Sequence, residues 1–250
     1  GELATAAVSS AAIAALGAFV WDRYFPLERV RDAAQAQTTS MAAEDADVDE
    51  LLRLIATAEE RLATDHTSRR VVLITDMKAF SKMTEEDGSV LTAKAIQRHR
   101  DLLLPVIEEH GGRGKSTGGD GLVAAFETPV TAVDAAGEMQ RVLAAHNASH
   151  PHERELLVRM GLAEGEVVLD KRGRPFIGNA LNLAARVMAL ADGGQVFATA
   201  EVASASSGRF VSHGEFELKN IARPVEVCEL LWSDAVRPQS PHERSAWAEE

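Results

Sequence analysis

Apolar and polar positions along the chain follow two periods, one typical of buried strands and one typical of amphipathic helices. Short apolar runs predict strands at 71–75, 122–126 and 195–199, and closing strands are expected at 210–219 and 224–232. Helical periodicity covers 84–110, 129–148 and 179–191. Because strands and helices alternate, the pattern predicts an α/β fold, an α+β sandwich in which helices pack on a sheet. Residues 156–170 predict two strands joined at Glu164-Gly165.

The N-terminal segment 3–21 carries no charged residue over 19 positions, which just reaches the length of a membrane span. Arginines at 23, 29 and 31 follow it, and arginines on that side favour a cytoplasmic position for the rest of the chain. The alternative is an Ala-rich soluble helix that packs in a dimer. We therefore expect residues 1–24 to be a membrane-spanning or Ala-rich helix. A membrane-spanning helix would anchor a cytoplasmic domain to the inner or plasma membrane.

A polar, acidic linker at 37–48 and an amphipathic helix at 49–64 precede the main domain. The apolar stripe of this helix runs from Leu51 to Leu62 and predicts a short dimerising coil. The expected organisation is a linker with a dimerising helix at 25–68, a main domain at 69–232 and a flexible tail at 233–250.

The net charge of −12 argues against a nucleic-acid partner, because such domains usually present a basic face. It does not exclude a nucleotide substrate, because a bound metal can offset negative charge locally. The single cysteine, Cys228, excludes an internal disulfide, and its apolar surroundings predict a buried strand residue.

The glycine-rich stretch GGRGKSTGGDG, residues 111–121, contains a Gly-Lys-Ser triplet but does not fit a P-loop. A P-loop needs a glycine at position 109, which is Glu109 here, and a helix after the loop, where this chain has a strand-like run. The stretch instead predicts a tight turn between two strands with Asp120 at its tip. Asp76 directly follows another strand, and two carboxylates at neighbouring strand ends can hold Mg²⁺ or Mn²⁺. The alternative for Asp120 is ordinary turn chemistry.

Five segments, in this order and spacing, resemble the class III nucleotidyl cyclases over residues 70–232. They are ITDMKAF (74–80), STGGDGLVAAF (116–126), VRMGLAEGEVV (158–168), IGNALNLAARV (177–187) and FELKNIARPVEVCEL (216–230). The resemblance implies a ferredoxin-like cyclase fold, here preceded by N-terminal helices, that works as a head-to-tail homodimer. It also implies a nucleoside triphosphate substrate, two bound metal ions, Mg²⁺ or Mn²⁺, and active sites at the dimer interface.

The resemblance assigns the metal-binding role to Asp76 and Asp120, with the backbone carbonyl of Met77 as a further contact. From the partner chain, Asn182 and Arg186 match the pair that orients the ribose and stabilises the transition state. Their i, i+4 spacing puts both on one helix face, which suits this task independently. The alternative for Arg186 is a surface salt bridge.

Lys219 resembles a lysine that contacts the polyphosphate, although a solvated lysine at a strand end is an equal alternative. The base-reading positions depart from the family pattern. The family's purine-selecting lysine falls on Ser116, with Lys115 beside it, and the second selecting position falls on Pro175. Since a shift of one residue moves a strand side chain to the other face, Lys115 is expected to serve only if a bulge occurs.

Three functions are therefore considered for the catalytic domain. The first is a cyclase that makes cAMP from ATP. The second is a cyclase with another base preference, such as a pyrimidine. The third is a catalytically weak module that binds nucleotide or regulates through dimerisation. A diguanylate cyclase is a minor alternative, because Gly121-Leu122 replaces the Glu-Phe of its GGDEF signature.

Overall fold

The computed structural model describes residues 67–78, 80–239 and 241. The segments expected to form a membrane-spanning helix (3–21) and a dimerising helix (49–64) lie outside these residues. Among the residues that are described, no helix is long and apolar enough to cross a membrane.

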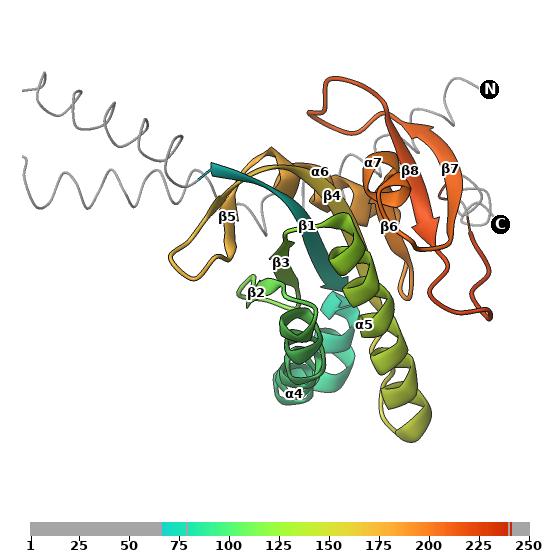
Figure 1. The fold of residues 1–250 in the computed structure, drawn as a ribbon. Helices are drawn as coiled ribbons and strands as arrows, with labels where there is room; N and C mark the ends of the chain where they lie inside the picture. The colour runs from blue at the N-terminus through green and yellow to red at the C-terminus, as the bar shows by residue number, and fades with distance from the viewer. Residues whose placement is uncertain (1–66, 79, 240, 242–250) are drawn as a thin grey trace, which may run out of the picture.

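In the described part of the chain, eight strands form one sheet, and seven of them follow the order β2-β3-β1-β4-β6-β8-β7 (Figure 1). The strands are β1 (Thr67–Met77), β2 (Arg113–Ser116), β3 (Leu122–Phe126), β4 (Val158–Leu169), β5 (Pro175–Ile177), β6 (Val196–Thr199), β7 (Phe210–Phe216) and β8 (Val225–Leu230). The helices are α4 (Phe80–Glu109), α5 (Pro129–Ser149), α6 (Asn179–Leu190) and α7 (Ala200–Ser204). β5 extends the sheet by pairing with the end of β4. The predicted α+β fold with helices on a sheet is confirmed.

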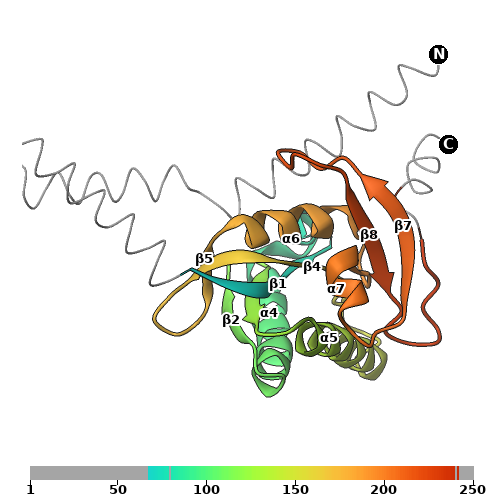
Figure 2. The ribbon, with the colours of Figure 1, turned by 45° about the horizontal axis from the view of Figure 1, so that its top comes forward.

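The two faces of the sheet are covered by different helices (Figure 2). On one face, Leu73 and Ala124 pack with residues of α4 and α5 such as Leu103 and Met139. On the other face, Val72, Ile74 and Val123 pack with α6. Alternate residues of β1 therefore point to opposite layers, as the pleat of a strand requires.

The hairpin predicted at Glu164-Gly165 is wrong, because β4 runs through both residues without a turn. Gly165 is paired with Arg70 in an unbroken register along β1. A Cβ atom at Gly165 would lie 2.8 Å from the Asn179 side chain, so glycine serves the close approach of α6 rather than a turn. The second strand that was expected here follows later, as β5.

The stretch 111–121 forms the β2–β3 hairpin and not a P-loop, as predicted. α4 begins at Phe80, four residues before the predicted start, and Gly88 interrupts its geometry with φ 78°. This left-handed value favours glycine and marks a kink between two helical pieces. α5 begins at Pro129, as predicted, after Thr128 caps it by accepting a hydrogen bond from the Thr131 backbone N–H.

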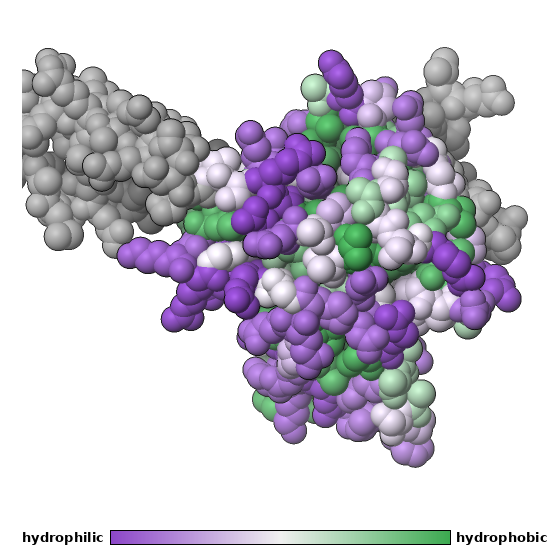
Figure 3. All heavy atoms as spheres, in the orientation of Figure 1, coloured by the Kyte–Doolittle hydropathy of each residue, from purple (hydrophilic) through white to green (hydrophobic). Residues whose placement is uncertain are grey.

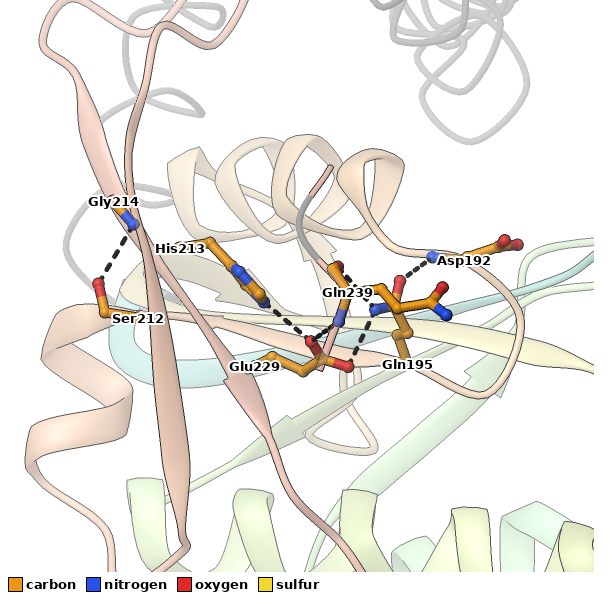
Figure 4. A network of polar contacts seen from close by, with 7 residues as sticks. All are labelled: Asp192, Gln195, Ser212, His213, Gly214, Glu229 and Gln239. Carbon is orange, nitrogen blue, oxygen red and sulfur yellow. Dashed lines mark hydrogen bonds and ion pairs between the residues drawn. The ribbon is translucent and has the colours of Figure 1, made fainter. Parts of the chain in front are cut away.

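A buried polar network ties the last strands to the loop after α6 (Figure 4). Glu229 on β8 is bonded to His213 Nε2 at 2.8 Å, Gln195 Nε2 at 2.9 Å and the Gln239 backbone N–H at 3.1 Å. Gln195 in turn accepts a hydrogen bond from the Asp192 backbone N–H at 2.7 Å. Since buried carboxylates need such partners, the network fixes the C-terminal segment at Gln239 and the end of α6 to the sheet.

Candidate active site

Two buried aspartates lie where β1 ends and β3 begins. β1 pairs antiparallel with β3, and Ile74 and Val123 form the last pair of the register, so Asp76 follows the paired part of β1 at the end where Asp120 precedes β3. Asp76 is 7% exposed and Asp120 is 1% exposed. The structure thus brings the two predicted carboxylates to one end of the sheet.

The turn that carries Asp120 is held from both sides. The Thr75 hydroxyl accepts a hydrogen bond from the Leu122 backbone N–H at 3.0 Å, which ties β1 to the start of β3. From α4, Arg100 Nη2 donates to the Gly119 carbonyl at 2.9 Å. These contacts fix the backbone one residue before and two residues after Asp120.

Asp76 is held by a cation of its own chain. Its strand partner on β4 is Arg159, whose Nη2 and Nε lie 2.6 and 3.0 Å from Asp76 Oδ2. The two side chains are only 10% and 16% exposed, so this ion pair is shielded from water.

His99 on α4 lies in the core near this end of the sheet. It is fully buried, and neither ring nitrogen has a hydrogen-bond partner within the described part of the chain. Burial, together with the neighbouring Arg100 charge, lowers the pKa of His99 to about 4, although the Asp76 charge opposes the shift. His99 is therefore neutral at physiological pH.

Asn182 and Arg186 both lie on α6, one turn apart. α6 sits very close to β4, because a Cβ atom at Gly161 would be 2.4 Å from the Ala184 carbonyl oxygen. Arg186 is buried, so it is not the surface residue that the salt-bridge alternative assumed, and burial lowers the pKa of its guanidinium. The Asn182 Oδ1 atom is also buried and has no hydrogen-bond partner among the described residues.

Lys115 lies in a regularly paired part of β2, on the same face of the sheet as Asp76. β2 pairs with β3 in regular register, with Lys115 opposite Val123 and Ser116 opposite Leu122. Since Val123 faces α6 together with Ile74, Lys115 shares the face of Asp76, and Ser116 points to the other layer. This regular register covers residues 113–116, and the bulge expected between Lys115 and Asp120 stays a prediction.

Pro175 is buried at the start of β5, and its neighbour Phe176 is 51% exposed. The Lys115 ammonium lies 5.4 Å from the centroid of the Phe176 ring, within the range of a cation–π contact. Partial burial lowers the pKa of Lys115, and the nearby Asp170 charge opposes this. Hydrophilic side chains gather around this β4–β5 hairpin (Figure 3).

Lys219 is exposed on the loop between β7 and β8. Leu218 and Ile221 of this loop pack with Val187 of α6, so Lys219 is carried by a segment anchored to the helix of Asn182 and Arg186.

The family model for the adenylate and guanylate cyclase catalytic domain matches residues 63–229, more than half of the chain. The chain belongs to this cyclase family. A curated relative, "Putative adenylate cyclase 3" of Rhizobium meliloti, is 31% identical over 186 residues, which cover 72% of this chain. The match spans only 31% of that relative, so this cyclase chain covers about a third of its length.

Solved structures agree with this assignment. The adenylate/guanylate cyclase/hydrolase from Silicibacter pomeroyi is 31% identical, with a TM-score of 0.56 over 68% of this chain and 99% of that one. The guanylyl cyclase Cya2 has a TM-score of 0.60 at 23% identity, over 70% of this chain and 97% of that one. The adenylyl cyclase CyaB from P. aeruginosa also has a TM-score of 0.60, at 19% identity, over 70% and 99%. The last two show the shared fold.

The donor set of the cyclase domain fits a hard divalent metal. Two carboxylates and the Met77 carbonyl offer only oxygen ligands, and Mg²⁺ is commonly bound by one or two carboxylates together with substrate phosphates. Within the described ranges no cluster of three or more His, Cys, Asp or Glu side chains could enclose a metal by itself. Asp76 and Asp120 would therefore hold the metal jointly with a polyphosphate.

Four residues near the candidate site were not singled out from the sequence: His99, Arg100, Arg159 and Phe176. Arg159 had one local signal, since it is the only charged residue between 157 and 163, a stretch that is otherwise apolar or glycine. His99 had another, because it falls on the same helical stripe as the buried Leu103.

Proposed function

We propose that the chain is a nucleotidyl cyclase that converts a nucleoside triphosphate to a 3′,5′-cyclic monophosphate and pyrophosphate. The observation that carries the proposal is the antiparallel pairing of β1 with β3, which leaves buried Asp76 and buried Asp120 at the same end of the sheet. In the reaction the ribose 3′-oxygen bonds to the α-phosphorus while the bond from that phosphorus to the bridging oxygen breaks. The hydroxyl loses its proton, and pyrophosphate leaves.

Asp76, Asp120 and the Met77 carbonyl would hold two divalent ions, Mg²⁺ or Mn²⁺. When bound, such ions neutralise the triphosphate and favour deprotonation of the attacking hydroxyl. Arg186 keeps its positive charge even when burial lowers its pKa, and it would stabilise the charge that develops on the α-phosphate. Asn182 would orient the ribose through its side-chain amide.

The site is proposed to form between two copies of the chain, as the family resemblance implies, with the aspartates from one copy and Asn182 and Arg186 from the other. A mixing experiment tests this arrangement. Asp120→Asn and Arg186→Gln should each be inactive, but their mixture should recover activity because a heterodimer keeps one intact site. No recovery from two folded variants that exchange subunits would contradict the shared site.

ATP is the proposed substrate. Support comes from Lys115, which lies on the face of Asp76, and from the adenylate cyclase name of the curated relative. Pro175 is buried and offers no side-chain hydrogen bond, so the base-reading set differs from the family pattern. A pyrimidine preference is the second candidate, because neither Ser116 nor Pro175 matches the residues that select a purine in the family pattern.

Product analysis by mass spectrometry tests the activity and the base together. The purified chain is incubated with ATP, GTP, CTP or UTP and Mn²⁺, with Asp120→Asn as the matched control. Cyclic AMP from ATP, lost in the control, supports the proposal, and a cyclic pyrimidine nucleotide would select the second candidate. No product from any triphosphate by a dimeric protein would favour a regulatory nucleotide-binding module.

Membrane attachment through residues 3–21 stays a proposal based on sequence. Removing residues 1–48 should move the chain from the membrane fraction to the soluble fraction without abolishing basal activity. A truncated chain that stays with the membrane would contradict the anchor.

A further inference from the structure

The ion pair between Arg159 and Asp76 places a fixed positive charge on one of the two proposed metal ligands. Two guanidinium nitrogens, Nη2 and Nε, converge on the same oxygen, Oδ2, at 2.6 and 3.0 Å. The two residues are direct partners in the β1–β4 register, so the backbone holds them together. Both side chains are largely shielded from solvent.

Because the pair is shielded from water, charges at this position interact strongly with one another. A buried carboxylate with no cation is strongly disfavoured, so Asp76 needs a positive partner whenever no metal is present. A divalent ion brought to Asp76 would stand close to the Arg159 guanidinium, and two positive charges repel strongly in a shielded site. The same carboxylate thus serves two cations that disfavour each other.

We propose that Arg159 is a positioning residue that neutralises Asp76 in the metal-free protein and competes with the divalent ion for it. This inference rests on the proposed metal role of Asp76. Without nucleotide, the Arg159 charge keeps the affinity for the divalent ion low. When the triphosphate binds, its negative charge offsets the repulsion, so that Arg159 and the divalent ion can both stay next to Asp76. Metal and nucleotide then load together.

The test is the affinity of the full chain for Mn²⁺ alone, measured by calorimetry and by the loss of the free Mn²⁺ electron paramagnetic resonance signal. Arg159→Gln removes the competing charge and should tighten Mn²⁺ binding roughly tenfold or more. The same variant should be less stable than the wild type without metal and should gain more in Tm on adding Mn²⁺, because the ion then replaces the lost partner of Asp76.

The matched control is Arg69→Gln. Arg69 also forms an ion pair between β1 and β4, with Glu164 at 2.8 Å, but its side chain is 67% exposed and it lies at the other end of β1. It should leave Mn²⁺ affinity unchanged. Arg159→Lys keeps the charge and should bind Mn²⁺ like the wild type, which separates charge from shape if the glutamine variant folds poorly.

Unchanged or weaker Mn²⁺ binding by Arg159→Gln would overturn the inference, since weaker binding would mean that Arg159 supports the metal site. If Arg159→Gln gives this binding result while the wild type makes a cyclic nucleotide, the proposed competition is refuted but the proposed cyclase function is not. If neither protein binds Mn²⁺ and no product forms with any triphosphate, both the competition and the proposed function fail.

Discussion

Removing the titratable group of His99 should flatten the pH dependence of stability. His99 is fully buried, neither of its ring nitrogens has a partner within the described chain, and its pKa is lowered to about 4, mainly by burial. In the unfolded chain its pKa returns to about 6.5. Since the unfolded state binds the proton more readily, stability is fully present above pH 6.5 and is lost as the pH falls towards 4.

The size of this loss follows from the shift. A difference of about 2.5 pKa units corresponds to about 3 kcal/mol, and roughly 1.4 kcal/mol is lost per pH unit inside the window. His99→Leu removes this loss. It also removes two buried polar atoms that lack partners, which should add about 1–3 kcal/mol at pH 7.5.

Urea denaturation followed by circular dichroism at pH 7.5, 6.5, 5.5 and 4.5, at one protein concentration, measures both effects as differences from the wild type. His99→Gln is the matched control, because it removes the titration but keeps a buried polar group. Both variants should lose the part of the pH dependence between 6.5 and 4.5 that comes from His99, and only the leucine variant should gain stability at pH 7.5.

A difference between wild type and His99→Leu that stays constant from pH 7.5 to 4.5 would refute the reasoning. It would mean that His99 is either protonated with a partner in the folded protein or reached by water.

Four other substitutions test the Glu229 network, the packing of α6 on β4, the turn at Asp120 and the proposed base-reading role of Lys115. Glu229→Ala should lower the free energy of unfolding by about 3 kcal/mol, because three donors lose a buried acceptor; a loss below about 1 kcal/mol in urea denaturation would contradict this. Gly161→Ala puts a methyl group against the backbone of α6 and should lower the free energy of unfolding by about 1–3 kcal/mol and also lower kcat. An unchanged Tm would contradict the close packing of α6 on β4. Arg100→Gln removes the hydrogen bond to the Gly119 carbonyl, just before Asp120, and should weaken Mn²⁺ binding roughly tenfold, as measured by calorimetry. An unchanged affinity would show that this hydrogen bond does not position Asp120 for the metal. Lys115→Met should lower kcat/KM for the preferred triphosphate roughly 10–100-fold with unchanged Mn²⁺ affinity; equal losses for all four triphosphates would show that Lys115 reads charge and not the base.

The elements with strong local periodicity could be predicted from the sequence, and those set by packing could not. The apolar run at 71–75 and the amphipathic stretch at 179–191 gave β1 and α6 within a few residues. Gly165 was misassigned because its turn-like signal has another cause, the Asn179 side chain above the strand. No local pattern shows that a helix crosses at that point.

The candidate site divides in the same way. Asp76 and Asp120 could be proposed because each lies at the end of a strong strand signal, and their meeting then needs only that the strands be neighbours. Arg159 is 83 residues from Asp76 in the sequence, and only the β1–β4 register reveals their pairing. The side of the sheet on which Lys115 lies is likewise set by its pairing with Val123 on β3. Counting residues from Lys115 to Asp120 in the sequence does not reveal this pairing.

Three unfavourable features gather at the end of β1, and together they argue that this region is shaped for function rather than stability. Asp76 is a buried charge, His99 is a buried ring with no hydrogen bond in the described chain, and Arg100 keeps a buried Nε atom without one. Natural proteins usually break packing rules at sites where a ligand acts. If this holds here, His99→Leu should gain stability and lose cyclase activity in the same protein. A variant that is more stable and equally active would show that His99 is only a tolerated defect of the core.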